Sequence, residues 1–201
     1  MGRYYGKNGR RSREKVNNRP KSYDYYKRGR DLAWETLIKC GISSLPVDLG
    51  RVAEVCGIRI VSFRRAEREG LIDRRRLRGS LVTDIVGGQK TVFVDNTMGD
   101  GAVRMNMAKG IGRCLLSENP GRASRRTYYE AAVFARDLLM PAIALFVLDI
   151  RDAAEIERIC SVPPKAALAR AERMAELRRR GKFNSHPLER KAGELFLRGS
   201  K

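Results

Sequence analysis

The chain has 201 residues, enough to bury a core of its own, and its 42% of apolar residues suits a globular fold. It contains no run of eighteen apolar residues, and its basic start lacks the apolar segment of a secretory signal. We therefore expect neither a membrane protein nor a secreted one, but a cytoplasmic protein.

The formal net charge of +19 is concentrated at the two ends of the chain. Residues 1–31 carry a net charge of +8 and residues 165–201 carry +7, whereas the long middle carries only +4. Because Lys and Arg release counterions when they contact phosphates, this bias predicts a polyanionic partner, either a nucleic acid or a ribonucleoprotein. A solvated surface that keeps the chain in solution is the alternative.

The secondary structure is predicted to begin with helices. An apolar stripe predicts a helix over 22–41, and a shorter one follows over 45–57. Residues 58–63 predict a strand, and residues 79–96 predict a β-hairpin that turns at two glycines. The stretch 67–79 between them is expected to be an exposed, charged loop. Later segments all predict helices, over 102–117, 124–139, 141–149, 152–159, 164–180 and 187–197.

This order predicts an α+β fold with N-terminal helices, a small, mainly antiparallel sheet and a helical C-terminal part. Residues 1–21 combine Gly, Asn and Arg without hydrophobic periodicity and predict a basic flexible arm. Residues 22–149 are expected to form the main domain, and residues 150–201 a basic, helical C-terminal subdomain.

The four cysteines show no pattern of a metal site. No C-x-x-C pair occurs, and Cys40, Cys56 and Cys114 fall within apolar patterns. We expect buried free thiols, as in a reducing compartment.

One predicted helix, in the stretch RMNMAKGIGRCLLSENPG (104–121), is unusual. Lys109 and Arg113 are four residues apart and share a face, and Gly110 and Gly112 stand beside them. A glycine inside a helix costs about 1 kcal/mol relative to alanine. The helix is therefore weakened where its two cations project.

Several linked segments resemble the ImmA/IrrE family. GISSLPVDLGRVAEVCGIRIVSF, RMNMAKGIGRCLL and YYEAAVFARDLLMP follow one another in the family's order and spacing, and the resemblance extends over residues 30–195. Members are zinc metallo-endopeptidases, often carried by phages and other mobile elements, with an implied role in cleaving a repressor. The resemblance implies a zincin-like, degenerate metallopeptidase domain over residues 22–149, in regulation or in host–element conflict.

In the family's H-E-x-x-H helix, two histidines ligate zinc and the glutamate acts as general base. By the resemblance, the histidine positions fall on Lys109 and Arg113, the glutamate on Gly110, and a third ligand on Glu130. Protonated Lys and Arg offer donors only, so we expect no metal, no cofactor and no catalytic residue here. Either Glu130 pairs with Lys109 or Arg113, or these cations point into solvent.

The segment 152–180 is typical of a helix-turn-helix. We expect Leu168, Ala171 and Ala175 to be buried in its second helix. We also expect this helix to contact phosphates rather than to read bases, because few of its side chains suit base edges. A structural or protein-docking role is the alternative. The candidate nucleic-acid-binding residues come from the arm, the charged loop and this helix: Arg10, Arg11, Arg13, Lys15, Arg74, Arg75, Arg76, Lys165, Arg170, Arg173, Arg178, Arg179 and Arg180.

The expected function is that of an inactive ImmA/IrrE-like protein that binds a partner. The partner is a nucleic acid, a ribonucleoprotein, or a repressor-like or defence protein. Two alternatives remain. One is an active metallo-endopeptidase that cleaves a repressor with non-standard ligands. The other is a direct DNA- or RNA-binding regulator that uses the C-terminal helices and the arm.

Overall fold

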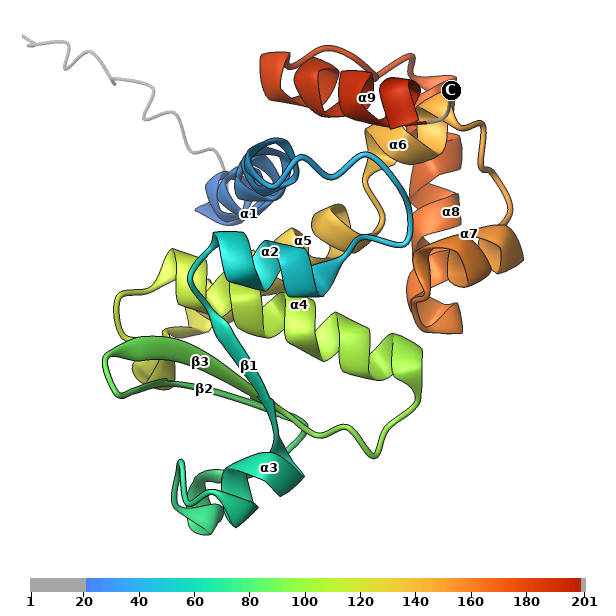
Figure 1. Ribbon diagram of the computed structural model, residues 1–201. Helices are drawn as coiled ribbons and strands as arrows, with labels where there is room; N and C mark the ends of the chain where they lie inside the picture. Colours follow the sequence, from blue (N-terminus) through green and yellow to red (C-terminus); the bar gives the residue numbers. More distant parts are fainter. Residues whose placement is uncertain (1–20, 200–201) are drawn as a thin grey trace, which may run out of the picture.

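The computed structural model describes residues 21–199 (Figure 1). A three-stranded sheet and one long helix form the centre of the fold. β3 (Gln89–Val94) is the middle strand, with β1 (Arg59–Ser62) parallel on one side and β2 (Leu81–Val86) antiparallel on the other. α4 (Asp100–Leu116) packs on this sheet, and α5 (Arg125–Leu139) packs on α4.

The sheet is mixed rather than mainly antiparallel, which corrects the expectation. One of its two strand pairs is parallel, because the chain between β1 and β2 crosses to the other edge of the sheet. The hairpin of β2 and β3 is confirmed. Gly87 and Gly88 have φ values of +58° and +77°, the left-handed conformation that a two-residue hairpin turn requires.

The N-terminal helices are also confirmed. α1 (Lys21–Lys39) buries Ala33, Trp34 and Leu37 and packs along α5. α2 (Leu49–Val55) begins after Asp48, whose side chain accepts a hydrogen bond from the backbone N–H of Arg51.

The C-terminal part is helical, as predicted. It comprises α6 (Ala142–Val147), α7 (Ala153–Cys160), α8 (Pro164–Arg179) and α9 (Pro187–Gly199). α7 packs on α8, and α9 packs on both α1 and α6 (Figure 1). One apolar core runs through residues on both sides of position 150, from α4 and α5 to α8 and α9. Among the described helices, none combines the length and the apolar character needed to cross a membrane.

A smaller apolar cluster supports a protruding segment, residues 63–78, which we call the arginine lobe. It contains α3 (Phe63–Arg68) and the short 3-10 helix η1 (Arg74–Arg76), and it lies beyond one end of the sheet (Figure 1). The sequence predicted a strand up to residue 63 and then a charged loop. Instead the strand ends at Ser62, whose hydroxyl accepts a hydrogen bond from the Arg65 backbone N–H and begins α3.

Candidate functional site

The two interior glycines of α4 allow this helix to lie very close to its neighbours. A Cβ at Gly110 would stand 3.0 Å from Leu81 Cδ1 and still closer to Val92 on the central strand. A Cβ at Gly112 would stand 2.7 Å from Phe134 Cδ1 on α5. Both distances are well inside ordinary carbon–carbon contact, so both positions require glycine. No glutamate side chain fits at position 110.

The two cations of this helix have different surroundings. The Arg113 guanidinium lies 4.1 Å from the centre of the Tyr128 ring, and its buried Nε has no hydrogen-bond partner among the described residues. Burial lowers the pKa of Arg113, and Tyr128 opposes this shift. Lys109 is half-buried and forms no hydrogen bond or ion pair within residues 21–199.

Glu130 is fully buried, but its partners are not the expected ones. Its Oε2 accepts a hydrogen bond from Arg28 Nη1 at 3.1 Å, and its Oε1 accepts one from Arg126 Nε at 2.7 Å. Of the two alternatives, the pair of Glu130 with Lys109 or Arg113 is therefore wrong. Arg113 does not simply point into solvent either, because its guanidinium lies against Tyr128.

The contact between α1 and α5 explains this pairing. Gly29 lies against the backbone carbonyl of Glu130, where a Cβ would clash, so the adjacent Arg28 is held above the carboxylate. Arg126 is one helical turn before Glu130 and reaches the other oxygen. The spacing of Arg126 and Glu130 is visible in the sequence. The contribution of Arg28, 102 residues away, has no local signal.

These residues do not fit a zinc ion. Lys109 and Arg113 offer only donors, and both oxygens of Glu130 already accept hydrogen bonds from arginines. No three His, Cys, Asp or Glu side chains gather into a possible metal site within the described part of the chain.

Two further side chains of types that serve in nucleophilic catalysis, His186 and Cys114, lie in other surroundings. The only histidine, His186, accepts a hydrogen bond at Nδ1 from the backbone N–H of Leu188 at the start of α9. Cys114 is fully buried, and burial raises the pKa of its thiol to about 12, so it is not a nucleophile at neutral pH. Neither side chain is therefore placed beside Glu130 to act with it.

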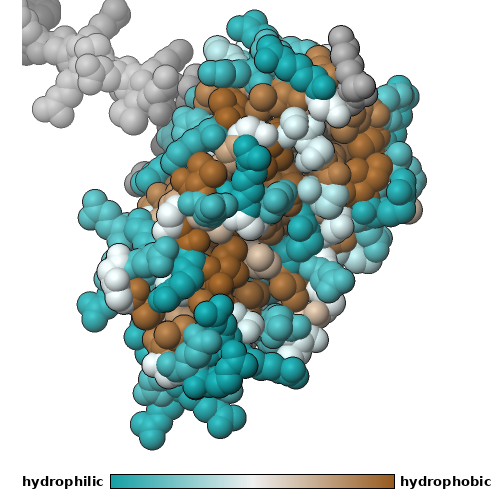
Figure 2. Space-filling view, in the orientation of Figure 1, coloured by the Kyte–Doolittle hydropathy of each residue, from teal (hydrophilic) through white to brown (hydrophobic). Residues whose placement is uncertain are grey.

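The arginine lobe holds the predicted residues Arg74, Arg75 and Arg76 at the surface. The Arg74 side chain is 86% exposed and lies 3.4 Å from a Glu67 oxygen, and Arg76 pairs with Asp84 at 2.5 Å. Arg75 is exposed, and its side chain has no ion pair among the described residues. In Figure 2, hydrophilic side chains project from this lower end of the molecule.

Four further arginines of the same segment were missed as candidates. Within residues 63–78, seven arginines stand against three acidic residues, which leaves a net charge of +4. The signal was the arginine density of the whole segment rather than the run of three. The four additional residues are Arg64, Arg65, Arg68 and Arg78.

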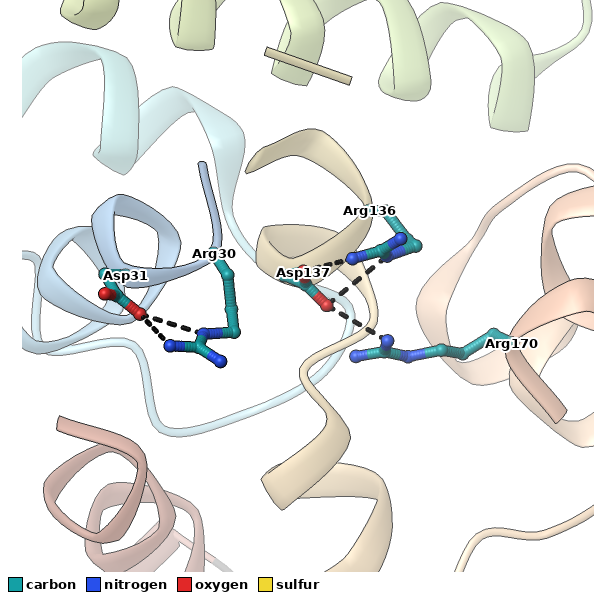
Figure 3. A network of polar contacts seen from close by, with 5 residues as sticks. All are labelled: Arg30, Asp31, Arg136, Asp137 and Arg170. Carbon is teal, nitrogen blue, oxygen red and sulfur yellow. Dashed lines mark hydrogen bonds and ion pairs between the residues drawn. The ribbon is translucent and has the colours of Figure 1, made fainter. Parts of the chain in front are cut away.

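Helix α8 presents a different face from the one predicted. It buries Ala167, Arg170 and Met174, whereas Leu168 is 53% exposed, so the predicted stripe is wrong. Arg170 is only 2% exposed, because its Nη1 pairs with Asp137 Oδ1 at 3.0 Å (Figure 3). In this conformation Arg170 is not available to a surface phosphate.

The other candidates on α8 are nearer the surface. Arg173 and Arg180 both pair with Glu176, and Arg178 donates to the backbone carbonyls of Leu145 and Ile150. Lys165 and Arg179 are exposed. The predicted arm residues Arg10, Arg11, Arg13 and Lys15 lie outside the described residues.

A scan against protein-family models and searches of the curated proteins and of the solved structures found no match for this chain.

Proposed function

We propose that this chain is an inactive, ImmA/IrrE-like protein that acts by binding a nucleic acid, and that the arginine lobe contacts its phosphates. The observation that carries the proposal is the charge of the lobe, where seven arginines outnumber three acidic residues on a protruding segment. Guanidinium groups bind phosphate oxygens in pairs of parallel hydrogen bonds.

The backbone of the lobe is anchored by a small apolar cluster, and its arginine side chains extend from this anchored backbone. Phe93 and Val61 of the sheet and Ala66 of α3 are buried together beneath it. Arg68 is 75% exposed and Arg74 is 86% exposed, so both reach into solvent from an anchored backbone. An anchored backbone loses less conformational entropy when it binds than a loose arm does.

Binding rather than catalysis is supported by the packing around α4. The positions that the resemblance assigns to zinc ligands hold Lys109 and Arg113, and the position of the general base is closed by Val92. A peptidase with these residues would lack both ligands and base. The proposed role in regulation or host–element conflict depends on the family resemblance alone, whereas the proposed cytoplasmic location comes from the sequence composition.

Readout of base edges by α8 is less well supported than phosphate contact by the lobe. The exposed side chains of its first turns include Lys165, Leu168 and Ala169, which offer a single hydrogen-bonding group. Arg170, expected to take part, is buried. A helix-turn-helix role is therefore a separate hypothesis.

The test measures affinity for labelled DNA and RNA duplexes of about 20 base pairs by fluorescence anisotropy. The test variant combines Arg74→Ala, Arg75→Ala and Arg78→Ala, all at exposed positions of the lobe. We expect affinity on the order of tenfold lower or worse at low salt, because three phosphate contacts are removed.

The matched control removes the same charge elsewhere, through Arg190→Ala, Lys191→Ala and Arg198→Ala at exposed positions of α9. We expect the affinity of this variant for the duplexes to fall by about threefold at most, since net charge alone acts at long range and is screened by salt. Equal losses in both variants would contradict a role for the lobe. A larger loss in the control would assign binding to α9. If the wild-type chain binds neither duplex, the proposal is refuted and a protein partner becomes the better hypothesis.

A further inference from the structure

A cavity of about 420 Å³ is lined by residues of α1, α5, α8 and α9. In Figure 1, α1, α8 and α9 lie away from the end of the molecule that holds the arginine lobe. Its walls hold only two carboxylates, those of Asp137 and Glu189. The function proposed above does not use this cavity. Six cations line it: Lys27, Arg30, Arg170, Arg173, Arg180 and Lys182.

Arg170 is the most informative of these cations. It is 2% exposed, and only its Nη1 is paired, with Asp137. Its Nε and Nη2 atoms are buried and have no hydrogen-bond partner among the described residues. These two atoms form one edge of the guanidinium, with two parallel N–H groups that match two oxygens of a phosphate or carboxylate. A buried charged donor without an acceptor is destabilising, so an anion on this edge would be favourable.

Neither of the two carboxylates that line the cavity pairs with this edge of Arg170. Asp137 is shared between Arg170 and Arg136, whose Nη2 lies 2.5 Å from its second oxygen. The Glu189 carboxylate accepts hydrogen bonds from the backbone at Ser185 and His186, just before α9. Arg30 lies on the far side of the cavity and pairs with Asp31. In Figure 3 the unpaired end of Arg170 points across this space toward Arg30.

Two of the cations that line the cavity are partly exposed and are held only by surface ion pairs. Arg173 and Arg180 are 42% and 57% exposed, and both are paired with Glu176, itself about one-third exposed. Such surface ion pairs contribute little to stability, so these long side chains can move aside at small cost. A ligand would then reach the edge of Arg170 that is sheltered from water.

We propose that this cavity binds a small phosphomonoester, with two phosphate oxygens held by Nε and Nη2 of Arg170. A phosphomonoester carries nearly two negative charges, which suits a site where one buried carboxylate stands between two guanidiniums. The volume is that of a pocket for a compact organic molecule. The ring of Trp34 and the half-buried Tyr26 line the part of the cavity beside Arg30, where the ester group would lie.

Trp34 provides a direct readout, because it is the only tryptophan of the chain and it lines the cavity. The experiment titrates the full chain with ribose 5-phosphate, with inorganic phosphate and with a 5′-phosphorylated oligonucleotide, and follows tryptophan fluorescence. Ribose alone is the neutral control. We expect saturable changes with both phosphates, the ester binding more tightly, and no change with ribose. A response confined to a 5′-phosphorylated oligonucleotide would assign the site to a nucleic-acid end and overturn the small-ligand proposal.

The test variant is Arg170→Lys, which keeps the positive charge beside Asp137 but removes the two-donor edge. We expect ribose 5-phosphate to bind roughly 10 to 100 times more weakly, as when charged hydrogen bonds are lost. The control, Arg179→Ala, removes an exposed cation of α8 that does not line the cavity and should change affinity less than about twofold.

If Arg170→Lys does not fold, Arg173→Gln at the rim replaces it, and we expect roughly 3 to 10 times weaker binding. Wild-type fluorescence that is unchanged by millimolar phosphate and ribose 5-phosphate would overturn the proposal. Unchanged affinity in Arg170→Lys, or in Arg173→Gln where it is the variant tested, would overturn it equally.

Discussion

The replacement Gly110→Ala tests whether α4 is packed as closely on the sheet as the structure indicates. The added Cβ would stand 3.0 Å from Val92 Cγ2 and from Leu81 Cδ1, and closer to Val92 Cγ1. Val92 is fully buried in the central strand, among other side chains of the core. Overpacking of this kind costs about 1–3 kcal/mol, and the better helix propensity of alanine returns about 1 kcal/mol. We therefore expect a net loss of up to about 2 kcal/mol.

The assay is urea unfolding followed by circular dichroism, with the midpoint and slope fitted for each variant. Lys109→Ala is the matched control, because it is the adjacent residue of the same helix and has no polar partner in the described structure. Its free energy of unfolding should change by about 0.5 kcal/mol or less. If Gly110→Ala were instead stabilised by about 1 kcal/mol, the gain in helix propensity would be uncompensated. The inference that the sheet closes this position would then be refuted.

Three other predictions follow from particular contacts. Purified protein should contain far less than one zinc per chain by elemental analysis, and stoichiometric zinc would contradict the view of Glu130 as a partner of Arg28 and Arg126. Lys90→Met should lower the free energy of unfolding, measured in urea, by about 1–3 kcal/mol. The reason is that Lys90 Nζ donates hydrogen bonds to the backbone carbonyls of Cys114 and Ser117 at the end of α4. An unchanged unfolding midpoint would refute this capping role. Burial raises the thiol pKa of both Cys114 and Cys160 from an ordinary 9.0 to about 12. The protonated thiols therefore make their full contribution to the free energy of unfolding below pH 9, and this contribution is lost as the pH rises toward 12. The free energy of unfolding should fall by up to about 1.4 kcal/mol per pH unit for each thiol, and the fall should be shallower in Cys114→Ala; parallel pH profiles would contradict the assignment.

The elements that follow from local patterns were predictable. The apolar stripe of α1, the two glycines at the hairpin turn and the helices after residue 100 all have short-range signals, and the structure contains each of them. The parallel pairing of β1 with β3 has no such signal, because it depends on how the chain crosses between sheet edges.

The face of α8 could not be predicted because its alanines make two faces equally apolar. Arg170 is buried only because Asp137, from another helix, pairs with it. The same holds at Glu130, where Gly29 brings α1 close enough for Arg28 to displace the expected partners. Local sequence signals therefore fail at these buried charges as well, since Arg28 and Asp137 come from distant elements.

The measurement that most directly tests the central claim is the salt dependence of DNA affinity, compared between the wild-type chain and the lobe variant Arg74→Ala/Arg75→Ala/Arg78→Ala. The slope of the logarithm of the association constant against the logarithm of salt concentration counts the phosphates contacted, at about 0.9 per phosphate. If the arginine lobe contacts phosphates, the slope should become less steep by about 2–3 in the variant. Parallel slopes would show that the lobe contacts no phosphates and would contradict the account.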